Sequence, residues 1–164
     1  MSFAGSEVFS VIDAFKGYWQ IALDEKDKPK TVFTTVFGLF QWTVLPFGLT
    51  NAPATWQRFM DNVLAGLLWL FVLVYIDDVV IFSQKPEDHI CHLDIVFTCL
   101  SNAGVHVSRT KCKFQALEIP LLGMIIDKQG IQPDPIKVKK VTKWQPPEDK
   151  DQLGQFLGLT NYYC

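Results

Sequence analysis

Charged residues are scarce in this chain. Lysine, arginine, aspartate and glutamate together make up 20% of the 164 residues, and the net charge is −2. A protein that grips nucleic acid unaided is usually basic, because its lysines and arginines must displace the counterions of the phosphates. The composition therefore argues mildly against an independent binder of DNA or RNA.

Long apolar runs and a secretory leader are also lacking. The longest apolar candidate, residues 63–74, falls short of the about 18 uninterrupted apolar residues that mark a membrane helix and contains Gly66 and Trp69. Residues 1–7 have neither the basic nor the apolar segment of a signal peptide. The sequence therefore predicts an intracellular protein with no membrane partner.

Cysteine pairs at metal-binding spacing are absent as well. The four cysteines are Cys91, Cys99, Cys112 and Cys164. None forms a C-x-x-C pair, so we expect reduced and mostly buried thiols in place of disulfides. His89 and His92 flank one of them, but no further ligand set accompanies these two histidines, and a zinc site is a poor explanation for them.

Runs of β-branched and aromatic residues alternate with segments of helical periodicity. The predicted strands are residues 8–12, 19–23, 31–36, 40–44, two arms of a hairpin within 73–82, 105–107, 121–126 and one beginning at Ile131. The predicted helices are one capped by Thr50 or Asn51, one from Pro86 to about Gly104, a short basic one within 136–144 and a last one from Asp149 or Asp151.

This order of elements indicates a fold class. Antiparallel hairpins are interrupted by two long helices, and the length suits one domain. On the second long helix, Ile90, Leu93, Phe97 and Leu100 are expected to form the inner face. The sequence predicts an α+β protein, an antiparallel sheet with two long helices packed on one face.

Two adjacent carboxylates, Asp77 and Asp78, fall at the tip of the hairpin in residues 73–82. Two like charges about 4 Å apart repel by roughly 1 kcal/mol in water and roughly 4 kcal/mol near a protein surface. Either the tip is fully solvated, as many Asp-rich turns are, or a cation neutralises the pair.

A third carboxylate, Asp13, ends the first predicted strand. If that strand neighbours the hairpin, three carboxylates converge, and Mg²⁺ prefers such oxygen ligands. Two ions about 4 Å apart would clamp the oxygens of a phosphoryl transfer. Aspartates also end strands simply as turn formers, so both interpretations stay open at this point.

A longer set of motifs resembles the palm of reverse transcriptases of the Ty3/gypsy long-terminal-repeat retrotransposon type. The motifs are FSVIDAFKGYWQI, VLPFGLTNAPATWQRFM, VYIDDVVIFS, AGVHVSRTKCKF, LLGMII, IQPDPIKV and FLGLTNYY. They follow the family's order and spacing from Val8 to Tyr163. The resemblance implies a polymerase palm and an RNA-directed DNA polymerase, a nucleotidyltransferase that uses two Mg²⁺ or Mn²⁺ ions, deoxynucleoside triphosphates and an RNA or DNA template with its primer.

The resemblance also implies a role for each matching residue. Asp13, Asp77 and Asp78 would be catalytic metal ligands, helped by the Ala14 carbonyl, and Lys111 would be the general acid toward pyrophosphate. The remaining roles are those of Tyr18, Phe47 and Gly48 beside the incoming nucleotide, Gln57 toward the template, Tyr75 toward the primer end, and Leu122, Gly123 and Met124 at the primer terminus. The Tyr18 ring would exclude a 2′-OH. By residue type alone, Tyr18 could equally be an ordinary half-buried aromatic residue, while Gln57 and Lys111 would be solvated surface residues.

The same resemblance divides the chain. Residues 1–132 would be the palm with most of the fingers missing, and residues 133–164 would begin the thumb and connection region. Family members carry basic fingers residues before the strand that ends at Asp13, and they continue into an RNase H domain. We therefore expect a polymerase that is slow or inactive alone. The alternative is a non-enzymatic, retrotransposon-derived remnant or co-opted binding protein that retains the palm fold.

Aromatic residues that would face the missing fingers give a further expectation. Phe33, Phe37, Phe40 and Trp42 occur close together in the sequence. If they are exposed, they favour association, either as a homo-oligomer or with the fingers and RNase H segments of a polyprotein. The resemblance implies an intracellular location, in the cytoplasm or in virus-like particles, with the nucleus as the other candidate.

Overall fold

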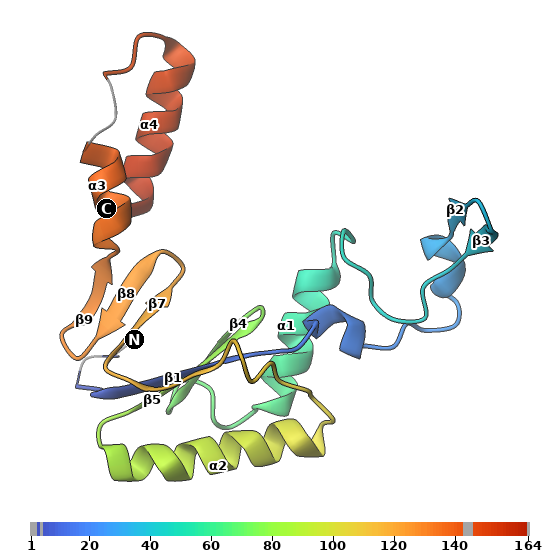
Figure 1. Ribbon diagram of the computed structural model, residues 1–164, viewed down its shortest axis with the longest axis horizontal. Helices are drawn as coiled ribbons and strands as arrows, with labels where there is room; N and C mark the ends of the chain where they lie inside the picture. The colour runs from blue at the N-terminus through green and yellow to red at the C-terminus, as the bar shows by residue number, and fades with distance from the viewer. Residues whose placement is uncertain (1–2, 4, 143–145, 164) are drawn as a thin grey trace.

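The computed structural model describes residues 3, 5–142 and 146–163 of the chain (Figure 1). A four-stranded antiparallel sheet lies at its centre, in the order β4 (Val72–Tyr75), β5 (Asp78–Ser83), β1 (Val8–Asp13) and β6 (Lys113–Ala116). The predicted first strand and the predicted 73–82 hairpin are confirmed, and they are neighbours in one sheet. Cys164, and Trp144 at the expected end of the basic helix, lie outside the described residues.

Two long helices, α1 (Ala52–Val63) and α2 (Pro86–Asn102), pack on one face of this sheet, as predicted. α2 runs along the sheet and α1 stands beside β4 (Figure 1). The apolar core between the layers includes Ile12 and Ile81 from the sheet and Trp56 and Leu100 from the helices. Their burial is the main stabilising contribution expected for such a layer.

The inner face of α2 differs in part from the prediction. Ile90 is 60% exposed, whereas Leu100 and the neighbouring Val96 are buried. His89 takes the inward position in the first turn of the face because Ser10 and Ser83 supply partners for its ring. A buried histidine with two hydrogen bonds displaces the more apolar Ile90 from that face, which hydrophobic periodicity alone could not indicate.

The opposite face of the sheet is partly covered by a second, three-stranded sheet of β7 (Glu118–Leu121), β8 (Met124–Asp127) and β9 (Gly130–Pro133). Ile119 and Ile126 from this sheet pack with Phe9 and Val80. The prediction of one strand over residues 121–126 was wrong. Leu122 and Gly123 have φ angles of +51° and +79°, so the chain reverses there into a hairpin.

A smaller hairpin of β2 (Phe33–Thr35) and β3 (Gly38–Phe40) projects from one end of the molecule. It confirms the predicted hairpin in shorter form, and Phe33, Phe37 and Phe40 are exposed on it. The predicted strand 19–23 was wrong. A 3-10 turn over Gly17–Gln20 begins after Lys16, whose φ is +52°, and only one bridge, Ala22 to Val44, follows.

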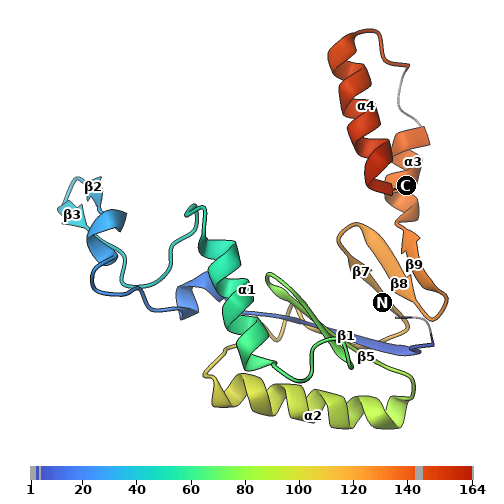
Figure 2. The ribbon, with the colours of Figure 1, turned by 180° about the vertical axis from the view of Figure 1, so that it is seen from behind.

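At the other end, α3 (Pro135–Thr142) and α4 (Lys150–Tyr163) form an arm that rises away from the central sheet (Figure 2). The last helix begins where the sequence predicted it. Among the residues that the structure describes, no helix has both the length and the apolar character to cross a membrane.

Candidate active site

Two of the predicted carboxylates lie directly opposite each other on neighbouring strands of the central sheet. Antiparallel register pairs Asp13, the last residue of β1, with Asp78, the first residue of β5. Side chains alternate along a strand, so both carboxylates share a face with Val11 and Val80. That face is turned away from α1 and α2, whose core receives Ile12 and Val79.

The third carboxylate, Asp77, lies in the tight turn between β4 and β5. Its backbone oxygen accepts a hydrogen bond of 3.4 Å from the Ala14 N–H, which ties the turn to the end of β1. A Cβ on Gly17 would lie 2.8 Å from the Asp77 Oδ1 atom, so only a glycine allows this approach. The structure therefore brings Asp13, Asp77 and Asp78 to one end of the sheet, together with Ala14.

The electrostatics of this cluster are unfavourable as it stands. Burial, followed by repulsion from Asp13 and Asp78, raises the pKa of Asp77 above its ordinary value. Burial and Asp13 raise the pKa of Asp78 in the same way. Both oxygens of Asp13 lie 3.4 Å from the Lys111 Nζ atom, and Lys111 lowers the pKa of the other two aspartates. The Lys111 side chain is 68% exposed, so water weakens this compensation.

Two oxygens of the cluster, the Oδ1 atoms of Asp13 and Asp77, are buried without a hydrogen bond within the described part of the chain. One of them, the Asp13 Oδ1 atom, nevertheless lies 3.4 Å from the Lys111 ammonium group. Buried carboxylate oxygens ordinarily have a partner, and hard divalent ions bind oxygen. The donor set therefore fits Mg²⁺ or Mn²⁺ chemically. Across the described residues, no group of three or more His, Cys, Asp or Glu side chains is already arranged to hold a metal ion.

Aromatic side chains form a wall beside the carboxylates. Tyr18 is buried, with its ring centroid 5.1 Å from that of Phe47 and 6.4 Å from that of Trp56. Burial, and then the charge of Asp77, raises the pKa of Tyr18. Phe47 is 59% exposed, and Gly48 after it has a φ of +92°. The structure thus places Tyr18 near Asp77 and Phe47 against Tyr18, with Gly48 next in the chain, while their roles toward a nucleotide stay predictions.

Gln57 has hydrogen-bond partners within the chain, whereas its residue type alone had indicated a solvated surface side chain. Its amide hydrogen-bonds the backbone of Val74 and Ile76 in the hairpin and the carboxylate of Asp61. A role toward the template stays a prediction. Tyr75 is 44% exposed at the end of β4, and Leu122, Gly123 and Met124 form the turn of the β7–β8 hairpin and the residue after it.

Sequence reasoning missed Gln20. Its side-chain amide donates hydrogen bonds to the backbone oxygens of Phe15, at 2.6 Å, and His106, at 3.0 Å. Its side-chain oxygen accepts one from the His106 N–H, at 2.8 Å. The Ser108 N–H, two residues further along the chain, donates to the backbone carbonyl oxygen of Asp13. Gln20 therefore joins the loop after β1 to the segment that carries Lys111. Its only sequence signal is a lone amide among the aromatic residues of FKGYWQI.

Replacement of Gln20 by leucine is expected to lower the free energy of unfolding by about 0.5–1.5 kcal/mol, because backbone groups of Phe15 and His106 exchange a protein partner for water. Urea unfolding followed by circular dichroism measures this. Gln155→Leu, the same change at an exposed position of α4, serves as the control and should alter stability much less. Equal effects of the two substitutions would contradict the assigned role of Gln20.

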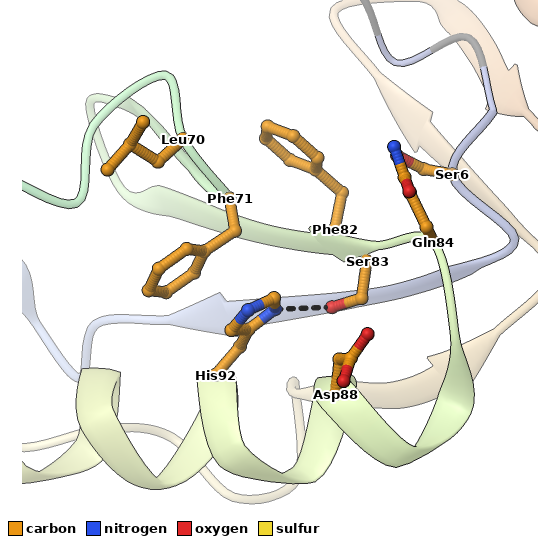
Figure 3. Close-up of a pocket in the computed structure, with 8 residues that line it drawn as sticks. All are labelled: Ser6, Leu70, Phe71, Phe82, Ser83, Gln84, Asp88 and His92. Atoms are coloured by element: carbon orange, nitrogen blue, oxygen red, sulfur yellow. Dashed lines mark hydrogen bonds between the residues drawn. The ribbon is translucent and has the colours of Figure 1, made fainter.

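The two histidines of α2 belong to a separate polar network. His89 is fully buried, and its ring nitrogens lie 2.8 Å from the Ser10 Oγ and 2.7 Å from the Ser83 Oγ. Ser83 also hydrogen-bonds His92, which borders a cavity of about 240 Å³ lined by Ser6, Leu70, Phe71, Phe82, Ser83, Gln84, Asp88 and His92 (Figure 3). Serine hydroxyls are the hydrogen-bond partners of these two histidines among the described residues.

This network predicts a pH dependence of stability. Burial, and then His92, lowers the pKa of His89. The unfolded chain, with an ordinary histidine pKa of about 6.5, then binds more protons than the folded protein below that pH. Stability is expected to be complete above about pH 6.5 and to fall as the pH decreases, by at most about 1.4 kcal/mol per pH unit for one proton.

Urea unfolding of the unsubstituted protein and of His89→Gln between pH 8 and pH 5 would isolate this contribution. The raised pKa values of Asp77 and Asp78 act in the opposite direction, toward greater stability at low pH, and they are common to both proteins. The difference between the two curves therefore reports His89. Parallel curves would show that His89 does not titrate differently in the folded protein.

An antiparallel sheet with helices on one face and three carboxylates gathered at one end is the arrangement of a nucleotidyltransferase palm, as the motifs predicted. Comparison with known proteins agrees. Residues 2–126 match the family described as "Reverse transcriptase (RNA-dependent DNA polymerase)". The chain belongs to the reverse transcriptase family.

Individual relatives support the long-terminal-repeat type. The chain is 43% identical over 157 residues to the retrovirus-related Pol polyprotein from transposon 297 of Drosophila melanogaster and 39% identical over 158 residues to that from transposon gypsy. Each match covers 96% of this chain and 15% of the relative. A foamy viral protease-reverse transcriptase solved with an RNA/DNA hybrid superposes with a TM-score of 0.81 and 28% identity, over 95% of this chain and 21% of that one.

Proposed function

We propose that this chain is the palm of an RNA-directed DNA polymerase that joins deoxynucleotides to the 3′-OH of a primer. The register that sets Asp13 opposite Asp78, with Asp77 in the adjoining turn and two buried carboxylate oxygens without a hydrogen bond in the described structure, is the observation that carries the proposal. An uncompensated set of oxygen donors at a sheet end suits phosphoryl transfer, which depends on positioned charge.

Reverse transcriptases generally use divalent metal ions. Here Asp13, Asp77 and Asp78, with the Ala14 carbonyl, would hold two Mg²⁺ or Mn²⁺ ions. Bound ions would supply electrostatic stabilisation of the charge that develops on the reacting oxygens. The chain itself fixes the carboxylates through the β1–β5 pairing and keeps part of them out of water. Lys111, 3.4 Å from Asp13, would carry the proton for the pyrophosphate leaving group on its Nζ atom.

The aromatic wall would receive the deoxynucleoside triphosphate. Tyr18 would lie under the sugar and leave no room for a 2′-OH, with Phe47 and Gly48 beside the incoming nucleotide. Gln57 would face the template. Tyr75 would approach the primer end, and Leu122, Gly123 and Met124 would support the primer terminus. Nucleic acid as a partner is supported by the foamy viral relative, which was solved with an RNA/DNA hybrid.

The 164 residues alone are expected to extend primers slowly. A net charge of −2 gives little electrostatic attraction for phosphates, and the chain spans 15% of the length of the polyproteins that it matches. We propose that exposed Phe33, Phe37 and Phe40 of the β2–β3 hairpin contact other polyprotein segments or a second copy. The division at residue 132 into palm and thumb or connection, and an intracellular location, remain parts of this proposal.

Primer extension tests the proposal directly. Purified chain is incubated with a primed RNA template, deoxynucleoside triphosphates and Mg²⁺, in parallel with Asp77→Asn. Incorporation that requires both the metal and Asp77 supports the polymerase. Equal signals from the two proteins would remove the enzymatic proposal and favour a non-enzymatic binding protein that retains the palm fold.

A further inference from the structure

The turn that carries Asp77 has a strained backbone. Ile76, the residue before Asp77, has a φ of +51°, in the left-handed region. β-branched residues rarely adopt this conformation because the side chain crowds the backbone. Such a residue persists only where its surroundings hold it in place, and strain of this kind gathers at functional sites.

Helix α1 supplies the groups that hold Ile76. The indole N–H of Trp56 donates a hydrogen bond of 2.8 Å to the Ile76 carbonyl oxygen. The side-chain oxygen of Gln57, the next residue of the helix, accepts one of 2.8 Å from the Ile76 N–H. Both backbone polar groups of the strained residue are therefore bound by two consecutive side chains of one helix.

Gln57 is itself held in orientation. Its amide nitrogen donates to the Asp61 Oδ1 atom at 2.9 Å, one helical turn further along α1, and to the Val74 carbonyl oxygen at 3.2 Å. The side chain thus spans the end of β4 and the turn after it. Trp56 is fully buried, so its indole cannot exchange this partner for water without leaving the core.

Trp56 also lies beside the space around Asp77. A Cβ on Gly17 would meet the Asp77 Oδ1 atom at 2.8 Å and the Trp56 ring at 3.3 Å. The Asp77 carboxylate and the Trp56 indole therefore border the same gap at Gly17. A shift of the turn would change where Asp77 lies relative to Asp13.

We propose that Gln57, together with Trp56, is a positioning residue for Asp77: the two side chains hold the strained Ile76 turn in the one conformation that directs the Asp77 carboxylate toward Asp13 and Asp78. This inference rests on the proposed function, since it assigns Gln57 to the metal-binding turn. It does not require Gln57 to touch the template or the nucleotide.

Two measurements on the purified chain test the positioning role. Mn²⁺ affinity is measured by electron paramagnetic resonance of the free ion, and hydrogen exchange of the Ile76 amide is measured by NMR in the metal-free protein. Gln57→Leu is expected to weaken Mn²⁺ binding about 10-fold, the usual scale for residues that orient metal ligands. It should also speed exchange at Ile76 about 10-fold or more, since that amide loses its acceptor. Asn62→Ala, an exposed change on the same helix, should alter neither.

A second pair of variants serves if Gln57→Leu does not fold. Asp61→Ala removes the acceptor that orients Gln57, whereas Asp61→Asn removes the charge but keeps an oxygen acceptor. We expect Asp61→Ala to weaken Mn²⁺ binding several-fold and Asp61→Asn to restore most of it. Global unfolding by urea accompanies each measurement, because a purely structural role would change stability without changing the affinity of the folded protein.

The outcomes separate this inference from the proposed function. Unchanged Mn²⁺ affinity and unchanged Ile76 exchange in Gln57→Leu would overturn the positioning role, even if Asp77→Asn abolishes Mn²⁺ binding. If the unsubstituted chain shows no Mn²⁺ binding that depends on Asp77, the proposed function fails, and exchange at Ile76 then decides alone whether Gln57 holds the turn.

Discussion

Asp77→Asn is expected to abolish nucleotide addition and, at the same time, to stabilise the metal-free protein. Loss of one metal-binding carboxylate should lower primer extension at least about 1,000-fold, which corresponds to about 4 kcal/mol of transition-state stabilisation. The gain in stability has a different cause, which is the unfavourable charge of Asp77 in the metal-free folded protein. The raised pKa of Asp77 means that its ionised form is disfavoured in the folded state, by burial and by the neighbouring carboxylates.

The sign of the stability change follows from that pKa. A neutral asparagine imitates the protonated acid, which the folded protein prefers, so the cost of ionisation near pH 7 disappears. Relief of repulsion from Asp13 and Asp78 is expected to contribute on the order of 1 kcal/mol, or about 2–4 °C in Tm for a chain of this size. Gains of this kind are typical when a functional site is neutralised.

Differential scanning calorimetry in the presence of a chelator, together with primer extension in Mg²⁺, measures the two effects. Asp94→Asn provides the control, because Asp94 is an exposed carboxylate of α2. It should leave both quantities nearly unchanged. An Asp77→Asn protein that is inactive but also clearly less stable would show that the carboxylate contributes to folding. It would contradict the conclusion that the ionised Asp77 side chain is unfavourable in the folded protein.

Replacement of Tyr18 by alanine is expected to remove the preference for deoxynucleotides. The buried ring packs between Phe47 and Trp56 and its pKa is raised in part by Asp77, which places it next to the proposed metal ligands. A site excludes a larger substrate mainly by steric conflict, so removal of the ring should admit a 2′-OH. We expect the ratio of kcat/KM for deoxynucleotides over ribonucleotides to fall by about 100-fold.

Steady-state incorporation of single deoxy- and ribonucleotides on one primed template gives this ratio. Tyr18→Phe keeps the ring and loses the hydroxyl group, so it should retain the discrimination. Because Tyr18 is part of the core, the Tm of each variant is measured to confirm that the protein is folded at the assay temperature. Unchanged discrimination in a folded Tyr18→Ala protein would show that another group excludes the 2′-OH.

The sequence was sufficient for the frame of the fold because its strongest local signals agreed with the tertiary structure. The apolar runs of β1 and of the β4–β5 hairpin, and the periodicity of α1 and α2, each matched the element that formed. Adjacency of Asp13 and Asp78 came from the ordered motifs, since no local pattern states which strands pair. The structure then supplied that pairing directly.

Several of the misassigned residues share one physical cause. Residues 19–23 alternate like a strand, yet Trp19 packs against Trp42 and Phe47, contacts between residues distant in the sequence. His89 lies in the α2 core because the fold brings to it the hydroxyl group of Ser10, 79 positions away in the sequence. Gln57 looked solvated because its partner, the Ile76 backbone, carries no sequence signal at all. Hydrogen-bond partners brought together only by the fold cannot be read from local periodicity.

The position of β1 has a consequence for how the molecule is made. This strand lies between β5 and β6, so both of its partners are synthesised after it. At about 5–20 residues per second, the ribosome needs roughly 4–14 seconds to advance from Asp13 to Ser83. During that interval the apolar run VFSVI is an unpaired β segment of the kind that joins neighbouring chains. Newly made chains are therefore vulnerable to aggregation through a strand that later lies in the interior of the sheet.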